Sequence, residues 1–342
     1  MEAPLHGRLG VLVRYAALGI ALIVAVAGLV AAILFVPFLA RVERHGAQPD
    51  RGFHAPYFLY VPPGARARGT DGGRMTLLVQ PNNSGINSDD AQVHEDDAWW
   101  TAFGRARLAD ELGVALLVPA FVRPAADWQI YTHALDRDSL TTNRPDLARP
   151  DLQLIAMVDD ARAALAAEGC AVDERFLLQG FSASGMFANR FAALHPNRVK
   201  AVAAGSPGGW PIAPVSSWNG QTLAYPAGVA DIADFTGKPF DAAAFCAIPQ
   251  LVVMGDLDDN DSVDFRDGWD EFEATQVDEL FGVTPLARWD AAKAIYRAAR
   301  ANAMFLLVPG VGHDRRALQE HSTRFFLDVL AAERPVAHNV EP

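Results

Sequence analysis

The pattern of apolar positions divides the chain into an N-terminal segment and a much longer remainder. No charged residue occurs from Tyr15 to Ala40, and at about 1.5 Å per residue this run exceeds the ~30 Å hydrocarbon core of a bilayer. Its one small-x-small cleavage site, Ala25-Val26-Ala27, lies mid-run, where cleavage would leave an apolar stretch on the mature N-terminus. We therefore expect residues 1–45 to form an uncleaved membrane anchor, with a cleaved signal as the alternative, and residues 46–342 to form one domain.

Within this domain, apolar runs of strand length alternate with helical patterns. Most of the runs are continuous rather than alternating, as in strands buried on both faces. The pattern predicts an α/β fold with a mostly parallel central sheet and helices on both faces. Helices are expected after Pro150, capped by Asp151, after Thr284, and around Leu318, Phe325 and Leu330. Strands are expected at 57–61, 75–80, 114–118, 176–179, 199–204, 251–254 and 304–308.

Residues 206–248 do not follow this alternation of strands and helices. The segment contains glycine, proline and the aromatic residues Trp210, Trp218 and Tyr225 without a clear period. Long connections of this kind are usually functional or disordered, and the aromatic content favours function. We expect an insertion that caps a site, with Trp210 in contact with substrate.

Composition argues against nucleic acid as a partner and does not decide whether the chain contains a disulfide. Acidic residues outnumber basic ones, 41 to 29, and lysine is nearly absent, so no broad cationic face is available for nucleic acid. The two cysteines, Cys170 and Cys246, are compatible with a disulfide or with two free thiols.

The clearest chemical motif is Gly180-Phe181-Ser182-Ala183-Ser184, which follows a predicted strand and opens a predicted helix. A nucleophilic serine at a sharp strand-to-helix turn requires small residues two positions before and after it. Ser182 meets this requirement, whereas Met186 rules out Ser184. The first helical N–H, that of Ala183, would stabilise an oxyanion. The structural alternative is a glycine turn with a capping serine.

Partners for Ser182 follow the next strands in the order acid, then histidine. His313 lies on a glycine-rich loop after the strand at 304–308 and is the expected general base. Asp258, three residues after the glycine that ends the strand at 251–254, is the expected acid, with Asp256 and Asp261 as alternatives.

The same acidic run partly fits a calcium-binding loop. Asp256, Asp258 and Asn260 occupy its first, third and fifth positions, but Asp261 and Asp267 stand where glycine and glutamate are required. We therefore predict no metal site.

A second oxyanion donor is expected from the loop after the strand at 75–80. The backbone N–H of Asn83 is the first choice, with Asn82 and Ser84 as alternatives. Tyr131 and His133 follow the strand at 114–118, at the rim where open α/β sheets bind ligands, and are candidate substrate contacts, although rim aromatics also serve packing.

The motifs GFSASG, GDLDDND and GVGHD, in this order, resemble those of the α/β-hydrolase superfamily, most of all secreted esterases of the polyhydroxyalkanoate depolymerase and feruloyl esterase type. The resemblance covers about residues 50–335. It implies hydrolysis of a small or polymeric ester through an acyl-enzyme, without cofactor and outside the cytoplasm. This location rests on the resemblance, because arginines flank both ends of the N-terminal apolar run and their charge does not set the membrane orientation. Ser184 and Pro81-Asn82-Asn83 depart from the usual second glycine and His-Gly. The alternatives are a serine peptidase and a non-catalytic binding module of the same fold.

Overall fold

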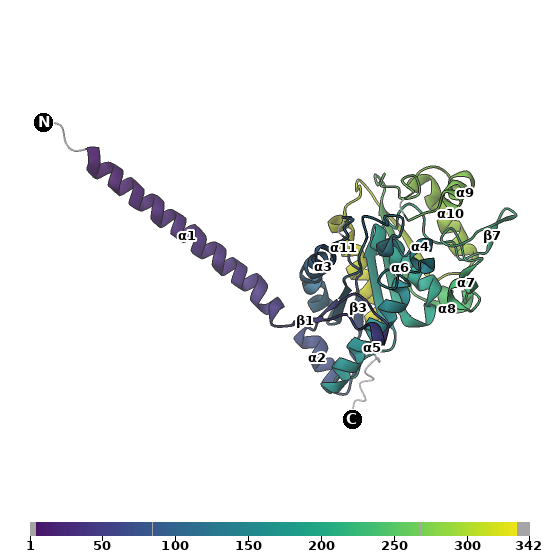
Figure 1. Ribbon diagram of the computed structural model, residues 1–342, viewed down its shortest axis with the longest axis horizontal. Helices are drawn as coiled ribbons and strands as arrows, with labels where there is room; N and C mark the ends of the chain where they lie inside the picture. The colour runs from purple at the N-terminus through teal and green to yellow at the C-terminus, as the bar shows by residue number, and fades with distance from the viewer. Residues whose placement is uncertain (1–4, 84, 267, 334–342) are drawn as a thin grey trace, which may run out of the picture. The chain divides into compact units, whose positions relative to one another are not determined.

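The computed structural model describes residues 5–83, 85–266 and 268–333 (Figure 1). The chain separates into two compact units, Met1–Val42 and Glu43–Pro342, compared with the expected division between residues 45 and 46. The first unit is one long helix, α1 (Leu5–Leu39). Its apolar stretch Tyr15–Leu39 has a mean hydropathy of 2.9, and an 18-residue window of that stretch contains no buried residue. A helix of this length and composition suits a membrane span, and a signal sequence has the same properties.

The second unit is built on an eight-stranded sheet of order β1-β2-β4-β3-β5-β6-β9-β10. Strand β2 runs antiparallel to β4, and every registered pair from β4 to β10 is parallel. The predicted sheet is therefore confirmed, and a strand lies at each of the seven predicted positions. The strands are β1 (Val42–His45), β2 (Tyr57–Tyr60), β3 (Leu77–Val79), β4 (Ala115–Pro119), β5 (Phe176–Phe181), β6 (Val199–Gly205), β9 (Gln250–Gly255) and β10 (Ala303–Val308).

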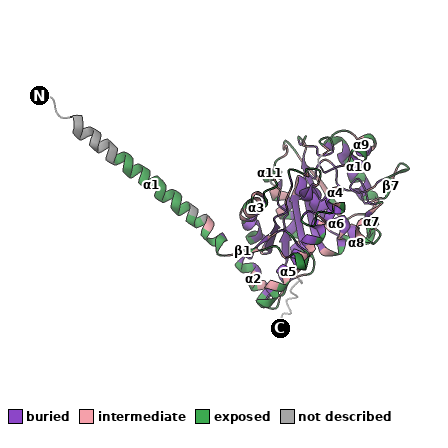
Figure 2. Ribbon diagram, viewed as in Figure 1, coloured by how far each residue is buried: buried purple, intermediate pink, exposed green. Residues whose placement is uncertain are grey.

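Helices cover both faces of this sheet. Figure 1 shows α3 and α11 on one side of the strands and α6 on the other. The interior strands are buried throughout, which explains their continuous apolar sequences (Figure 2). The helices are α2 (Pro63–Thr70), α3 (Ala91–Leu112), α4 (Arg137–Thr141), α5 (Pro150–Ala167), α6 (Ala183–Leu194), α9 (Glu271–Phe281), α10 (Pro285–Ala298) and α11 (Arg315–Ala332), with 3₁₀ turns at Pro49–Arg51, Thr132–Ala134 and Pro196–Arg198.

The helix boundaries show one correction to the sequence-based expectations. The Thr284 hydroxyl accepts a hydrogen bond from the N–H of Ala287 at 3.1 Å and caps α10, as expected. Asp151, in contrast, lies inside the first turn of α5, and Arg149 occupies the N-cap position. The fully buried Asp151 carboxylate instead accepts hydrogen bonds from Arg149 and His195 at 2.7 Å each.

The segment 206–248 packs part of its length into the hydrophobic core. It forms a small hairpin, β7 (Ser217–Trp218) and β8 (Gln221–Thr222), followed by α7 (Ile232–Thr236) and α8 (Ala242–Ala247). The Trp210 ring stacks on Phe281 with centroids 4.2 Å apart, and its indole N–H donates to the Ala227 carbonyl at 2.9 Å. The aromatic residues that suggested a cap therefore contribute to the hydrophobic core.

Cys170 and Cys246 are both free thiols in the structure. The disulfide that the sequence left open is not formed.

Replacing Trp210 by alanine is expected to lower the free energy of unfolding by about 3–5 kcal/mol, because the change removes a fully packed aromatic side chain. Trp128, which is 52% exposed, is the matched control, and its replacement should cost about 0.5 kcal/mol or less. Urea unfolding of the full chain in detergent measures both. Equal losses for the two variants would contradict the core assignment.

Candidate active site

Ser182 occupies a sharp turn between the end of β5 and the start of α6. Its backbone has φ 58° and ψ −126°, a conformation that residues with a side chain rarely adopt. Gly180 makes this turn possible: a Cβ at position 180 would lie 1.8 Å from the carbonyl oxygen of Ser184. The Ser184 hydroxyl braces the turn by accepting from the Phe181 N–H at 3.0 Å and donating to the Phe181 carbonyl at 2.9 Å. The serine that replaces the usual second glycine thus has a structural role.

Two further predicted residues meet beside this turn. Nδ1 of His313, on the loop after β10, lies 3.0 Å from each carboxylate oxygen of Asp258, on the loop after β9. The His313 ring packs against Phe181 with centroids 4.5 Å apart. Gly255 allows the two loops to approach, since a Cβ there would lie 1.9 Å from the carbonyl oxygen of Val311.

The charge state of Asp258 follows from its surroundings. Burial acts to raise the pKa of this carboxyl group, but the hydrogen bond from His313, the nearby Ser206 hydroxyl and the His313 charge outweigh burial, so the pKa lies below its ordinary value. Ser206 makes no well-formed side-chain hydrogen bond in the described part of the chain, so the partners that the geometry supports are His313 and the Asn260 N–H, which donates to Asp258 Oδ1 at 3.1 Å. Asp258 therefore stays ionised near neutral pH.

The neighbouring carboxylates have other partners. Asp256 accepts a hydrogen bond from the Gly310 N–H at 2.7 Å. Asp261 forms a buried ion pair with Arg288, whose Nη1 lies 2.8 Å from both carboxylate oxygens. Within the described residues, Asp258 alone of these three contacts His313, and Asp267 lies outside those residues. These contacts give Asp256 and Asp261 partners other than His313.

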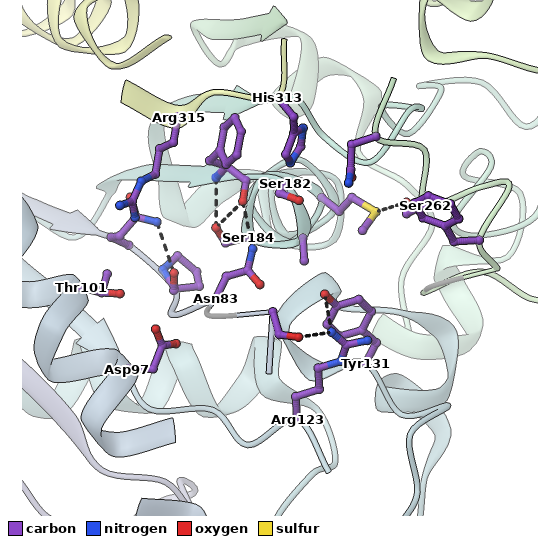
Figure 3. A pocket seen from close by; sticks show the side chains of 18 of the residues that line it. Asn83, Asp97, Thr101, Arg123, Tyr131, Ser182, Ser184, Ser262, His313 and Arg315 are labelled. Carbon is purple, nitrogen blue, oxygen red and sulfur yellow. Dashed lines mark hydrogen bonds between the residues drawn. The ribbon is translucent and has the colours of Figure 1, made fainter. Parts of the chain in front are cut away.

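Ser182 and His313 open onto one cavity of about 620 Å³ (Figure 3). No hydrogen bond links the Ser182 hydroxyl to the His313 ring in the described part of the chain, although both side chains line the same space. Catalytic hydrogen bonds are often incomplete in ligand-free structures and tighten when substrate binds. Ala183 and Asn83, the expected oxyanion donors, also line the cavity.

The two oxyanion candidates come from different parts of the chain, the start of α6 and the loop after β3. Ala183 is the first residue of α6, so its N–H has no acceptor within the helix and lies at the positive end of the helix dipole. Asn83 is fixed beside the turn because its amide Nδ2 donates to the Phe181 carbonyl at 3.2 Å. Asn82 is fully buried and exchanges 3.0 Å hydrogen bonds with the backbone N–H and carbonyl of Phe121, which is a structural role. Ser84 lies outside the described residues.

Of the three predicted substrate contacts, only Tyr131 lines the cavity. Its hydroxyl accepts from Arg123 at 3.1 Å, and the Arg123 guanidinium lies 3.7 Å from the centre of its ring. His133 is fully buried beneath the rim, with Nε2 2.7 Å from the Phe121 carbonyl, and Trp210 belongs to the core. Neither His133 nor Trp210 therefore lines the cavity, and their role as substrate contacts stays a prediction from the sequence.

Several cavity residues were not predicted from the sequence. Asp97 and Thr101 come from α3, Arg315 opens α11, and Phe265 belongs to the loop that follows Asp258. None of them lies in a recognisable motif, and α3 itself was not predicted. No residue of the 206–248 segment lines this cavity.

Comparisons with known proteins identify the fold. No family model matches the sequence, and no curated protein matches it. Poly(aspartic acid) hydrolase-1 from Sphingomonas sp. KT-1 is similar in structure, with a TM-score of 0.52 at 20% identity over 79% of this chain and 92% of that one. A poly(3-hydroxybutyrate) depolymerase from Bordetella parapertussis gives 0.50 at 20% identity over 84% and 89%. The chain thus has the α/β-hydrolase fold expected from its motifs.

Burial lowers the pKa of His133 to about 3, which makes a pH effect on stability predictable. The unfolded chain binds a proton on this residue below about pH 6.5, whereas the folded protein excludes it until about pH 3. Stability should therefore fall as the pH drops through this window. In urea unfolding between pH 7 and 4.5, His133→Gln is expected to flatten the pH dependence, and the exposed control His54→Gln to leave it unchanged. Equal slopes in all three proteins would show that His133 is not a buried neutral histidine.

Proposed function

We propose that the protein is a serine hydrolase of carboxylic esters in which Ser182 is the nucleophile, His313 the general base and Asp258 the acid. The observation that carries this proposal is the hydrogen bond from His313 Nδ1 to Asp258 beside the strained turn of Ser182, at one cavity. A histidine held in this way presents Nε2 as a base.

The first half of the reaction forms an acyl-enzyme. Ser182 Oγ attacks the ester carbonyl carbon while His313 Nε2 takes the hydroxyl proton. The backbone N–H groups of Ala183 and Asn83 stabilise the negative charge on the carbonyl oxygen. When the carbon–oxygen bond to the alcohol breaks, His313 returns the proton to the departing alcohol. Asp258 stabilises the imidazolium that exists between these transfers.

The second half consumes water. His313 removes a proton from a water molecule that attacks the acyl carbon, and then protonates Ser182 Oγ as the acid leaves. This sequence requires no electron transfer, so the residues proposed here are sufficient for the chemistry.

We also propose that residues 15–39 anchor the protein in a membrane, with the catalytic domain outside the cytoplasm. The length and composition of the helix support an anchor. A cleaved signal and a secreted enzyme are the alternative.

Ser182→Ala is expected to abolish covalent labelling by a fluorophosphonate probe and hydrolysis of short acyl esters, because the attacking oxygen is removed. Gel fluorescence and a pH-stat assay measure the two effects. Ser184→Ala is the matched control, since the Ser184 hydroxyl is bonded to the Phe181 backbone, and it should remain labelled. Labelling that persists in Ser182→Ala would refute the nucleophile, and faster cleavage of peptide amides than of esters would favour a peptidase.

Asp258→Asn is expected to lower kcat by about 10⁴-fold, because an amide favours the wrong histidine tautomer and does not stabilise the imidazolium. Asp256→Asn is the control, since an amide oxygen still accepts the Gly310 N–H, and kcat should change little. Steady-state kinetics on one ester at pH 7.5 compares the two. The reverse pattern would assign the acid to Asp256.

A further inference from the structure

Two amide side chains in the cavity wall each have an oxygen without a hydrogen-bond partner. Gln80, 4% exposed, follows the end of β3, and Asn83 lies on the same loop; both line the cavity. Gln80 Oε1 and Asn83 Oδ1 are buried, and in the described part of the chain neither accepts a hydrogen bond.

The orientation of both amides is determined by their other ends. Gln80 Nε2 donates to the Pro81 carbonyl at 3.2 Å, and Asn83 Nδ2 donates to the Phe181 carbonyl at 3.2 Å. A carbonyl oxygen only accepts, so in both side chains the nitrogen must face it. Rotating either amide by 180° would set two oxygens against each other. The unpartnered atoms are therefore acceptors.

One of these acceptors, on Asn83, lies close to the reacting group. The Asn83 side chain donates a hydrogen bond to the carbonyl of Phe181, the residue before Ser182. Figure 3 shows its amide directed at the turn that carries the nucleophile. The backbone N–H of Asn83 is also the proposed second oxyanion donor. A carbonyl bound at that N–H would hold its nearest substituents within reach of the Asn83 side chain.

We propose that Gln80 and Asn83 select substrates with a neutral hydrogen-bond donor, a hydroxyl or an N–H group, close to the scissile carbonyl. This inference rests on the proposed function of Ser182. Both oxygens are buried and unbonded in the empty cavity, so a substrate that brings a donor to them forms a hydrogen bond that the protein itself leaves unmade. A substrate with only C–H groups at this position leaves both oxygens buried and unbonded, and therefore reacts less well.

Two pairs of esters test this selection. On the acyl side, methyl 2-hydroxypropanoate is compared with methyl 2-methylpropanoate, in which a methyl group replaces the hydroxyl. On the alcohol side, 2-hydroxyethyl butanoate is compared with propyl butanoate. For each pair, the ratio of kcat/KM for the hydroxylated ester to that for the methyl analogue is measured with the full chain in detergent.

The variants are Gln80→Met and Asn83→Leu, which remove the acceptors and keep similar volume. We expect the ratio to fall about tenfold in each variant for at least one pair, and that pair identifies the side of the ester that is recognised. Comparing ratios between proteins cancels the electronic effect of the hydroxyl on the ester. Thr101→Val, which changes another residue of the same cavity, should leave the ratio unchanged.

The outcomes separate this inference from the proposed function. If Ser182 is labelled by a fluorophosphonate and esters are hydrolysed, but the ratios in both variants equal those of the wild type, donor selection is refuted and the hydrolase remains. Absence of both labelling and hydrolysis refutes the hydrolase and the selection with it. The kcat/KM ratio of either variant alone tests the selection, so if one variant misfolds, the other still gives the answer.

Discussion

The steric constraint at the end of β5 governs the arrangement of the site. The chain reverses from strand to helix within one residue, and Ser182 bears a positive φ that its side chain disfavours. The contact between Gly180 and the Ser184 carbonyl allows this close reversal, and the Ser184 hydroxyl holds both backbone groups of Phe181. The strain is maintained because β5 and α6 are buried on all sides, so the surrounding core determines the serine conformation.

The parallel sheet brings the other components to the same edge. The strands β5, β6, β9 and β10 are neighbours, so the loops after β9 and β10 emerge beside the turn after β5. Residues separated by more than a hundred positions in sequence therefore meet without a dedicated connecting segment. The absence of a side chain at Gly255 lets the loops of Asp258 and His313 touch.

The sequence revealed those features that depend on local pattern. Buried strands appear as continuous apolar runs, and the turn at Ser182 requires small residues at fixed spacing, so the sheet and the order of Ser182, Asp258 and His313 were predictable. Local sequence pattern does not reveal whether an aromatic side chain packs in the interior or lines the cavity. Trp210 and His133 pack in the interior, while Tyr131 lines the cavity. The helix α3 was missed because it carries charged residues along much of its length and has only a weak apolar stripe.

The ion pair between Asp261 and Arg288 anchors the loop after Asp258, which forms part of the cavity wall. Arg288 is 1% exposed and also bonds Asp278 of α9, so the loop that continues from Asp258 is tied to α9 and α10. Removing one partner from such a buried pair leaves an uncompensated charge, which typically costs about 3–5 kcal/mol. This part of the wall tolerates little sequence change, and divergence in substrate preference among variants of this chain would accumulate on the part formed by α3 and the loop after β3.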